Sequence, residues 1–322
     1  MKIALLGTSF GQLHAAIYAQ HPVEVVVFGR TPSALDELHQ RYGFETTTDL
    51  DGIFDDPSID LIDICLPSKL HAELILRGLA AGKHVFSEVP VALNFSDAQR
   101  VADAAAVSDR EVFVDLHLRF GSAHRRLREA VTAGEHGKLL ALDLEVRAGE
   151  WPGYDGRLNN ITLDTLHTEI DAILHTLGMP ESCTVAGADG PVHGSAIHIV
   201  LTYPDTVVRI SGTTLMPSTY GIRTGYLATF TEGVIEYSVT VPPGQMPRAT
   251  LAEFTAAAHT ESPADQPDPY ALTIEHVLAC LRGEAANQIS PASLLDSLRL
   301  TLDIQDAVTN EPHGVHRIEL RR

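Results

Sequence analysis

The sequence predicts an α/β protein in which a parallel sheet is followed by an open, mainly antiparallel sheet. Over roughly the first 120 residues, short apolar runs alternate with stretches of helical period, which is typical of the strand–helix units of a parallel sheet. After about residue 137 the apolar runs are separated by turns instead, for example at Thr231-Glu232-Gly233. We therefore expect two domains, residues 1–120 and residues 121–322.

The elements of the first domain are marked by caps and breakers. Thr31-Pro32 predicts the start of a helix with a proline in its first turn, and Gly43 and Gly82 predict helix ends. The expected strands cover residues 2–6, 23–28, 61–66, 84–87 and 111–116, and the expected helices cover residues 11–19, 31–43, 69–81 and 97–106.

The second domain is predicted to contain five strands, at residues 139–147, 195–203, 207–213, 226–231 and 234–239. One helix, over residues 162–177, interrupts them. A stretch rich in Pro, Ala and acidic residues predicts a loop at 259–269. Two helices then follow, near residues 272–282 and 291–308, the second capped by Ser290-Pro291.

The composition of the chain excludes several classes of protein. A net charge of -19 over 322 residues argues against a general affinity for nucleic acid or an anionic membrane. The N-terminal MKIALLG has no apolar signal-peptide core. The three cysteines, Cys65, Cys183 and Cys280, are too far apart in the sequence for metal-ligand spacing, so no metal site is expected. Their odd number does not suit a disulfide framework. They are therefore predicted to be buried thiols of a protein in the reducing cytoplasm.

The stretch from Gly7 through Thr8, Ser9 and Phe10 to Gly11 follows the first strand and opens a helix. A glycine turn in that place aims helix N-terminal amides at a pyrophosphate, so we expect these five residues to bind a dinucleotide. Ser9 stands where a second glycine is usual, but its hydroxyl can itself donate to phosphate.

The end of the second strand predicts which dinucleotide is bound. A carboxylate there would bind a ribose 2′-hydroxyl, but this sequence has Arg30 and Thr31. Arg30 can pair with a 2′-phosphate, and Thr31 caps a helix whose amides attract anions. NADP is therefore favoured over NAD, although NAD stays possible. The alternative is that Arg30 is a solvated surface residue.

Five segments together resemble the Gfo/Idh/MocA family, the relatives of glucose-fructose oxidoreductase and inositol dehydrogenase. They are GTSFGQLH from Gly7, LPSKLH from Leu66, AGKHVFSEVP from Ala81, HLRF from His117 and DTLHTEID from Asp164. The resemblance implies an N-terminal Rossmann domain and a C-terminal α/β domain whose open sheet often mediates dimers or tetramers. It also implies a hydride transfer between NAD(P) and a sugar, a cyclitol or a related carbonyl compound.

The sequence departs from the family at two catalytic positions. The family has Glu-Lys-Pro where this chain has Glu88-Val89-Pro90, and valine cannot donate a proton. The family's second motif is an Asp, a His four residues later and an Asp three residues beyond. Asp164 and Asp171 match the two acids, but Thr168 occupies the histidine position.

A histidine one residue early, His167, is the expected replacement for the proton donor. On an α-helix Asp164, Thr168 and Asp171 share one face, and His167 lies about 60° to the side. We expect Asp164 or Asp171 to orient His167 and to raise its pKa. The alternatives are that His167 is a packed histidine, and that His117, at the end of a parallel strand, is the donor.

Further site residues are expected from the resemblance and from position. Near the cofactor we expect Leu66, Pro67, His71, Glu88 and Pro90, with a plain helical histidine as the alternative for His71. The loop WPGYDGR precedes the motif helix, so Trp151, Tyr154 and Arg157, together with Thr168, are expected to contact substrate unless that loop is simply packed at the surface.

The leading functional hypothesis is an NADP-dependent oxidoreductase acting on a carbonyl or imine compound, either sugar-derived or a specialised metabolite. The substituted Lys and His positions favour an imine, because a basic imine nitrogen needs less help from an enzymic acid than a ketone does. The alternative is a catalytically silent NADP-binding sensor or partner subunit. A sugar hydrolase is disfavoured because it would need the missing base. The expected partners are a small-molecule substrate and a second copy of the chain in a homodimer or homotetramer.

Overall fold

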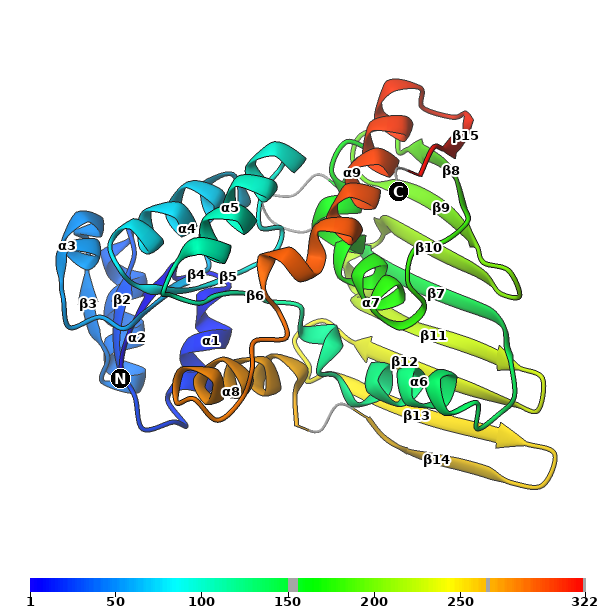
Figure 1. The fold of residues 1–322 in the computed structure, drawn as a ribbon, viewed down its shortest axis with the longest axis horizontal. Coiled ribbons are helices and arrows are strands. Elements are labelled where there is room, and N and C mark those ends of the chain that lie inside the picture. The colour runs from blue at the N-terminus through cyan, green and yellow to red at the C-terminus, as the bar shows by residue number, and fades with distance from the viewer. Residues whose placement is uncertain (150–155, 265–266, 321–322) are drawn as a thin grey trace. The chain divides into compact units, whose positions relative to one another are not determined.

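The computed structural model describes residues 1–149, 156–264 and 267–320, which form two compact units (Figure 1). One unit comprises Met1–His117 and Tyr270–Leu295, and the other comprises Leu118–Pro269 and Asp296–Arg322. The expected second domain, residues 121–322, differs from this division because Tyr270–Leu295 joins the first unit. Hydrogen bonds explain the difference, since the Val114 amide donates to the carbonyl oxygen of Ile289.

The first unit contains a parallel sheet of six strands in the order β3-β2-β1-β4-β5-β6. The strands are β1 (Lys2–Leu6), β2 (Glu24–Phe28), β3 (Glu45–Thr47), β4 (Leu61–Ile64), β5 (His84–Ser87) and β6 (Val112–Val114). Residues Ile3 to Leu6 of β1 are fully buried, as expected of a strand that is covered on both faces. The predicted parallel sheet is confirmed, and its strand order is that of the doubly wound Rossmann domain that the resemblance implies.

The helices of the first unit begin and end largely where the sequence signals predict. They are α1 (Gly11–Tyr18), α2 (Pro32–Tyr42), α3 (Leu50–Asp55), α4 (His71–Ala80), α5 (Phe95–Val107) and α8 (Pro269–Leu281). Gly43 ends α2 with a φ of 73°, the left-handed conformation that glycine adopts without strain. Thr31 occupies the N-cap of α2 and Pro32 the first turn, as predicted, although the Thr31 side chain makes no capping hydrogen bond.

The second unit contains a nine-stranded sheet in the order β14-β13-β12-β11-β7-β10-β9-β8-β15. The strands are β7 (Leu139–Gly149), β8 (Ser182–Asp189), β9 (Ser195–Thr202), β10 (Val207–Met216), β11 (Ile222–Phe230), β12 (Gly233–Val241), β13 (Arg248–Thr255), β14 (His259–Pro263) and β15 (Val315–Ile318). Neighbouring strands are antiparallel except β7 and β10, which confirms a mainly antiparallel sheet. The loop predicted at 259–269 is wrong at its start, because β14 pairs there with β13.

One face of this sheet carries the helices α6 (Ser122–Ala133), α7 (His167–Leu177) and α9 (Leu295–Asn310), as Figure 1 shows. Leu127, Ile170 and Ile304 from the three helices pack with sheet residues such as Leu142 and Ile199 in one core. A π-helix, Thr162–Leu166, precedes α7. None of the helices in the described residues is both long and apolar enough to cross a membrane.

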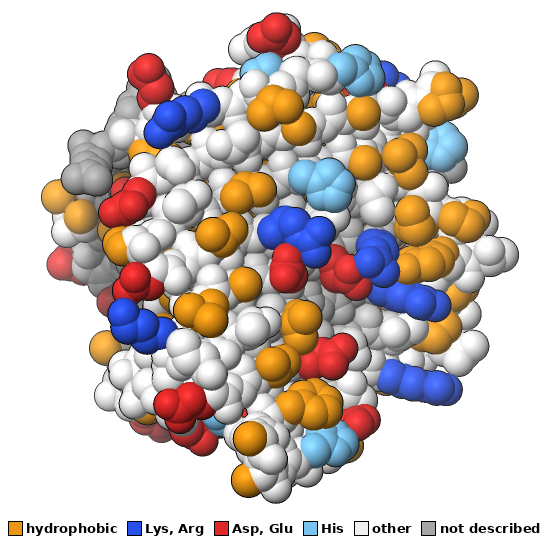
Figure 2. All heavy atoms as spheres, turned by 90° about the vertical axis from the view of Figure 1, so that its right-hand side faces the viewer, with side chains coloured by type: hydrophobic (Ala, Val, Ile, Leu, Met, Phe, Trp, Pro, Cys, Tyr) orange, Lys and Arg blue, Asp and Glu red, His pale blue; other side chains and the backbone are white. Residues whose placement is uncertain are grey.

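The opposite face of the sheet is more polar than the sequence predicts. Exposed Leu227 on β11 is paired with Asp143 on β7 and with Glu236 on β12, and Arg209 on β10 forms an ion pair with Asp143 at 2.6 Å. Figure 2 shows a face of the molecule on which hydrophobic side chains are scattered among acidic and basic ones. The sequence of 195–213 and 226–239, with runs such as His198-Ile199-Val200-Leu201, predicts apolar residues on both faces of these strands. That prediction is wrong, because most outward positions are charged or polar.

Candidate functional site

The turn after β1 has a backbone that only glycine adopts easily. Gly7 has a φ of 124°, and a Cβ atom there would lie 2.4 Å from the carbonyl oxygen of Cys65. Its amide donates to the carbonyl of Phe28 at the end of β2, and α1 begins four residues later at Gly11. The turn is therefore held closely against two neighbouring strands of the parallel sheet.

The residues between these glycines form an anion site. The amides of Gln12 and Leu13 are bonded to the carbonyls of Ser9 and Phe10, whereas no described residue accepts a hydrogen bond from the amides of Ser9, Phe10 or Gly11. The first turn of α1 contains no acidic residue. Free amides at a helix N-terminus bind phosphate groups, so Gly7–Gly11 fits the pyrophosphate of a dinucleotide.

The end of β2 brings a cation close to this turn. A Cβ atom on Gly29 would lie 2.6 Å from the Thr8 side chain, which places the strand end directly against the turn. The next residue, Arg30, is exposed, and no described residue forms an ion pair or hydrogen bond with it. Phe28–Thr31 contains no carboxylate. These features fit a phosphate on the adenosine ribose better than a bare 2′-hydroxyl.

The loops after β4 and β5 are joined by a buried histidine. The Nδ1 atom of His71 lies 2.8 Å from the carbonyl oxygen of Pro90, and its Nε2 lies 2.7 Å from that of Leu66. Burial lowers the pKa of His71. This histidine therefore positions two loops at the carboxyl edge of the sheet. Pro67 and Glu88 lie in the same loops, at the edge where parallel sheets bind ligands.

His117 lies just beyond β6 at the same edge of the sheet. Its ring stacks on that of Tyr270, with centroids 4.1 Å apart and an angle of 19° between the planes. Tyr270 also meets Phe10 of the glycine turn edge-on at 5.7 Å. The turn, the end of β6 and the start of α8 are thereby linked by aromatic contacts within the first unit.

Beneath the glycine turn lies a group of buried ionisable residues, which we call the His14 cluster: His14, Asp63, Cys65, Glu88 and Asp115. The Nδ1 atom of His14 lies 2.8 Å from Asp63 Oδ2. On the other side of the ring, Nε2 lies 3.1 Å from Glu88 Oε1 and 3.6 Å from Asp115 Oδ2. The Cys65 thiol lies 3.4 Å from His14 Nδ1.

Burial and mutual charge shift the pKa values in the His14 cluster. Burial lowers the pKa of His14, but the neighbouring Asp63, Cys65 and Asp115 together outweigh burial and hold that pKa well above its usual value. Burial, followed by the nearby Asp115, raises the pKa of Glu88 to about 8. Burial also raises the pKa of the Cys65 thiol, so this cysteine is a poor nucleophile.

In the second unit, the motif helix is not a continuous α-helix. Residues Thr162–Leu166 form a π-helix and α7 starts only at His167. A π turn has more residues per turn than an α turn, so angles calculated at 100° per residue do not hold across it. The prediction that Asp164 and Thr168 share one helix face therefore lacks its geometric basis.

His167 is buried and does not have the environment expected of a proton donor. Its Nδ1 lies 3.2 Å from Thr301 Oγ1, and burial lowers its pKa to about 4. Asp171 does raise this pKa, but burial outweighs that effect, so the predicted net rise is wrong. Asp171 is already bonded by Arg119 through two contacts of 2.8 Å and by the Ser297 hydroxyl at 2.8 Å. We infer that His167 and Asp171 stabilise the unit rather than exchange protons with substrate.

The remaining predicted residues of the second unit lie in different surroundings. Asp164 is exposed, and Thr168 donates to Glu169 Oε2 at 3.0 Å. Burial raises the pKa of Glu169 to about 7. Arg157 bonds to the Asp189 carboxylate and to the carbonyl of Val192, both at 3.2 Å. Trp151 and Tyr154 lie outside the described residues.

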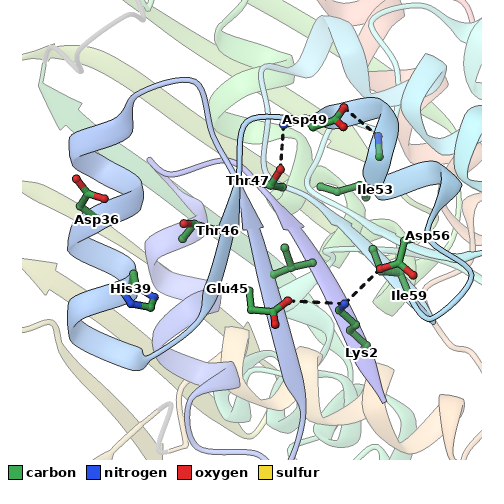
Figure 3. Close-up of a pocket in the computed structure, with 12 residues that line it drawn as sticks. Lys2, Asp36, His39, Glu45, Thr46, Thr47, Asp49, Ile53, Asp56 and Ile59 are labelled. Carbon is green, nitrogen blue, oxygen red and sulfur yellow. Dashed lines mark hydrogen bonds and ion pairs between the residues drawn. The ribbon is translucent and has the colours of Figure 1, made fainter.

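A hollow of about 560 Å³ in the first unit lies away from these groups (Figure 3). Lys2 reaches toward it between Glu45 and Asp56, at 3.7 and 3.2 Å. Lys2 begins β1 and Glu45 begins β3, so the hollow is at the amino edge of the parallel sheet. Ligands of such sheets bind at the carboxyl edge, so this hollow is not the candidate site.

Sequence reasoning did not single out His14, Asp63 or Asp115. A signal was present, because Asp63 interrupts the apolar strand LIDICL and Asp115 follows the apolar VFV. A carboxylate inside a strand that is covered on both faces requires a specific partner. The partner could not be identified from sequence, since His14 lies 49 residues before Asp63.

Comparisons with known proteins agree with this geometry. A family model described as an oxidoreductase family with an NAD-binding Rossmann fold matches residues 1–116. The myo-inositol 2-dehydrogenase of Thermotoga maritima is 30% identical over 161 residues, 49% of this chain and 48% of that protein. The inositol 2-dehydrogenase of Rhizobium meliloti is 32% identical over 197 residues, 58% of each protein. The chain thus spans about half the length of the curated relatives it matches.

Solved structures extend the likeness to both units. An oxidoreductase from Agrobacterium radiobacter, in complex with NAD+, L-tartaric acid and magnesium, has a TM-score of 0.80 to this chain. The superposition covers 99% of this chain and 98% of that one at 18% identity. At this identity the likeness establishes the fold of the chain and nothing more.

Proposed function

We propose that the chain is a member of the Gfo/Idh/MocA family of oxidoreductases and that it transfers a hydride between NADP(H) and a carbonyl or imine compound. The observation that carries the proposal is the glycine turn of residues 7–11 with Arg30 beside it. The amides at the start of α1 would hold the pyrophosphate, and Arg30 would pair with the 2′-phosphate. The nicotinamide would supply the hydride chemistry.

The choice of NADP over NAD leads to a first expected result. Replacing Arg30 by alanine should raise the Kd of NADPH by about 10- to 100-fold, because a charge-assisted contact to phosphate is lost. The Kd of NADH should change little. Fluorescence titration of both dinucleotides measures the two constants. The matched control is Arg41→Ala at the far end of α2, which removes the same charge and should alter neither. Tighter binding of NADH than of NADPH by the unaltered protein would refute the NADP assignment.

The substrate class follows from the two substituted positions. Val89 offers no proton, and Thr168 is hydrogen-bonded to Glu169. General acid catalysis is typically worth about 10²- to 10⁴-fold, so an imine, whose nitrogen is already basic, suits this chain better than an unactivated ketone. The relatives named as inositol dehydrogenases support a polar, sugar-like framework. We place the enzyme in the cytoplasm, in keeping with its free cysteines Cys65, Cys183 and Cys280.

A direct assay tests the activity. NADPH oxidation is followed by absorbance with a panel of keto sugars, oxidised cyclitols and cyclic imines. We expect turnover of at least one imine or sugar-derived carbonyl compound. Tight NADPH binding without turnover of any compound in the panel would contradict the proposal. It would favour the alternative, a silent NADP-binding sensor or partner subunit.

We further infer that the chain forms a homodimer or homotetramer through the outer face of its nine-stranded sheet. Helices cover the other face, and the outer face has a hollow of about 260 Å³ around Gly225, bordered by Leu227, Glu145 and Glu236. An exposed sheet face with a hollow and a large apolar side chain suits a second copy of the chain.

The oligomer can be tested at Leu227. Leu227→Arg should shift the protein from dimer or tetramer to monomer in light scattering at micromolar concentration, because a long charged side chain would replace the exposed apolar one and would have to be desolvated in the interface. The control is Val107→Arg in the first unit, at an exposed position at the end of α5, which should leave the mass unchanged. A monomer in the unaltered protein would overturn the inference.

A further inference from the structure

The His14 cluster buries more negative charge than it can neutralise with its own groups. It holds three carboxylates and one imidazole, and His14 and Asp115 are almost completely buried. Neither oxygen of Asp115 has a hydrogen-bond partner among the described residues, and neither do Glu88 Oε1 and His14 Nε2. Buried carboxylate oxygens without partners are costly, so these atoms require a bound cation or protons.

Two carboxylate oxygens lie near His14 Nε2, at distances close to those between ligands of one metal ion. His14 Nε2 lies 3.1 Å from Glu88 Oε1 and 3.6 Å from Asp115 Oδ2. Ligands bonded to one ion at about 2.1 Å lie roughly 3 to 3.5 Å from one another, depending on the coordination geometry. We propose that His14 Nε2, Glu88 Oε1 and Asp115 Oδ2 bind a divalent first-row transition-metal ion.

The side of His14 away from the proposed ion supports this assignment. Metal-binding histidines usually donate their second ring N–H to a carboxylate, which fixes the tautomer and the ring orientation. Here His14 Nδ1 donates to Asp63 Oδ2 at 2.8 Å, and Tyr18 donates to the same oxygen at 2.8 Å. The ring also stacks on Phe86, with centroids 5.5 Å apart. His14 is therefore held with Nε2 aimed at the two carboxylates.

The ligand types indicate which metals fit. One imidazole and two carboxylates suit Mn²⁺, Fe²⁺ or Zn²⁺. Cys65 Sγ is within 4.8 Å of candidate ligand atoms of His14 and Glu88. However, Cys65 contacts Nδ1 of His14 at 3.4 Å and Asp63 Oδ1 at 3.6 Å, so it belongs to the Asp63 side of the ring. We therefore assign Cys65 no role as a ligand.

The proposed ion would lie at the carboxyl edge of the parallel sheet. Glu88 directly follows β5 and Asp115 directly follows β6, and these strands are neighbours. Val89 is the next residue after Glu88. A cation here would supply positive charge close to the position where the family has a lysine. This last consequence rests on the proposed function, whereas the metal site itself does not.

Metal binding can be measured without substrate or dinucleotide. The full chain is stripped with a chelator, and Mn²⁺ or Zn²⁺ is titrated into it by isothermal calorimetry. We expect one saturable site per chain and a higher melting temperature when metal is present, because an ion that binds only the folded state stabilises it. Asp115→Asn and Glu88→Gln should each weaken binding by at least 10-fold and reduce the melting-temperature shift.

Asp115→Asn also separates the metal site from a general effect on folding. The change removes one of two neighbouring buried carboxylates that repel each other, so the metal-free variant should melt at the same temperature as the unaltered protein or at a higher one. Two controls should bind metal normally. Cys65→Ser tests the excluded thiol. Glu253→Gln alters a second His–carboxylate group, which consists of Glu135, His136 and Glu253. There the Glu253 carboxylate already accepts two hydrogen bonds of 2.7 Å from Arg126, so we expect no metal to bind.

Three outcomes would overturn the proposal. The first is the absence of a saturable site in the unaltered protein, which would mean that the cluster is neutralised by protons. The second is normal metal binding by Asp115→Asn. The third is loss of binding in Cys65→Ser alone, which would assign a different set of ligands. Because no step of this experiment uses a dinucleotide, its failure is distinguishable from failure of the proposed oxidoreductase activity.

Discussion

Replacing Asp171 by asparagine is expected to lower the free energy of unfolding by about 3–5 kcal/mol, the cost typical of breaking a buried ion pair. Asp171 is 2% exposed and Arg119 is 9% exposed, so the remaining guanidinium would stay buried opposite a neutral amide. The two residues are joined by two contacts of 2.8 Å, and Ser297 adds a third hydrogen bond to the same carboxylate.

Urea denaturation followed by circular dichroism measures this loss. Asp306→Asn on α9 is the matched control, since Asp306 is exposed and its loss should change stability by no more than about 0.5 kcal/mol. A double-mutant cycle with Arg119→Met isolates the pair, because the double variant no longer leaves a buried charge alone. The double variant should be less destabilised than the sum of the single ones. An effect of Asp171→Asn equal to that of Asp306→Asn would contradict this account.

The parallel sheet was predictable because each of its main strands has a local signal. Val25–Phe28 is a continuous apolar run, and Leu61–Ile64 is apolar except at Asp63, as expected of strands buried on both faces. The strands that were missed, such as β13 and β14, lie at the edge of the second sheet and contain no continuous apolar run. Such strands owe their conformation to pairing with a neighbour, which periodicity along the chain cannot reveal.

The site was predictable only where it depends on local backbone geometry. Gly7 directly follows β1 and Arg30 is the second residue after β2, so their places at the carboxyl edge could be expected. The His14 cluster, in contrast, gathers side chains from α1, β4 and the ends of β5 and β6. The π-helix before α7 was not foreseeable from a pattern that assumes 3.6 residues per turn. The position of His167 relative to Asp164 on the helix was therefore predicted from the wrong geometry.

The environment of His167 leads to an expected dependence of stability on pH. Burial lowers the pKa of His167 to about 4 in the folded protein, against an ordinary value of 6.5. Above pH 6.5 the residue is neutral in both the folded and the unfolded chain, and it has no effect on the pH dependence. Between these values the unfolded chain binds a proton that the folded chain does not, so stability falls as the pH falls.

Protonation of this one residue should lower the free energy of unfolding by about 3 kcal/mol once the pH is below both pKa values. Between about pH 7 and about pH 5 the free energy of unfolding should fall by about 2 kcal/mol. His167→Gln removes the titrating group and keeps a side chain that can bond to Thr301. On acidification from about pH 7 to about pH 5, the free energy of unfolding of the variant should therefore fall by about 2 kcal/mol less than that of the unaltered protein. This difference does not depend on the stability of the variant at neutral pH.

The measurement compares urea midpoints at both pH values for the unaltered protein, for His167→Gln and for His193→Gln. His193 is exposed in a loop of the same unit, so its replacement should leave the pH dependence unchanged. If His167→Gln loses as much stability on acidification as the unaltered protein, then His167 is protonated in the folded state. In that case the imidazole would be open to proton exchange, and a role for His167 as a proton donor would again be reasonable.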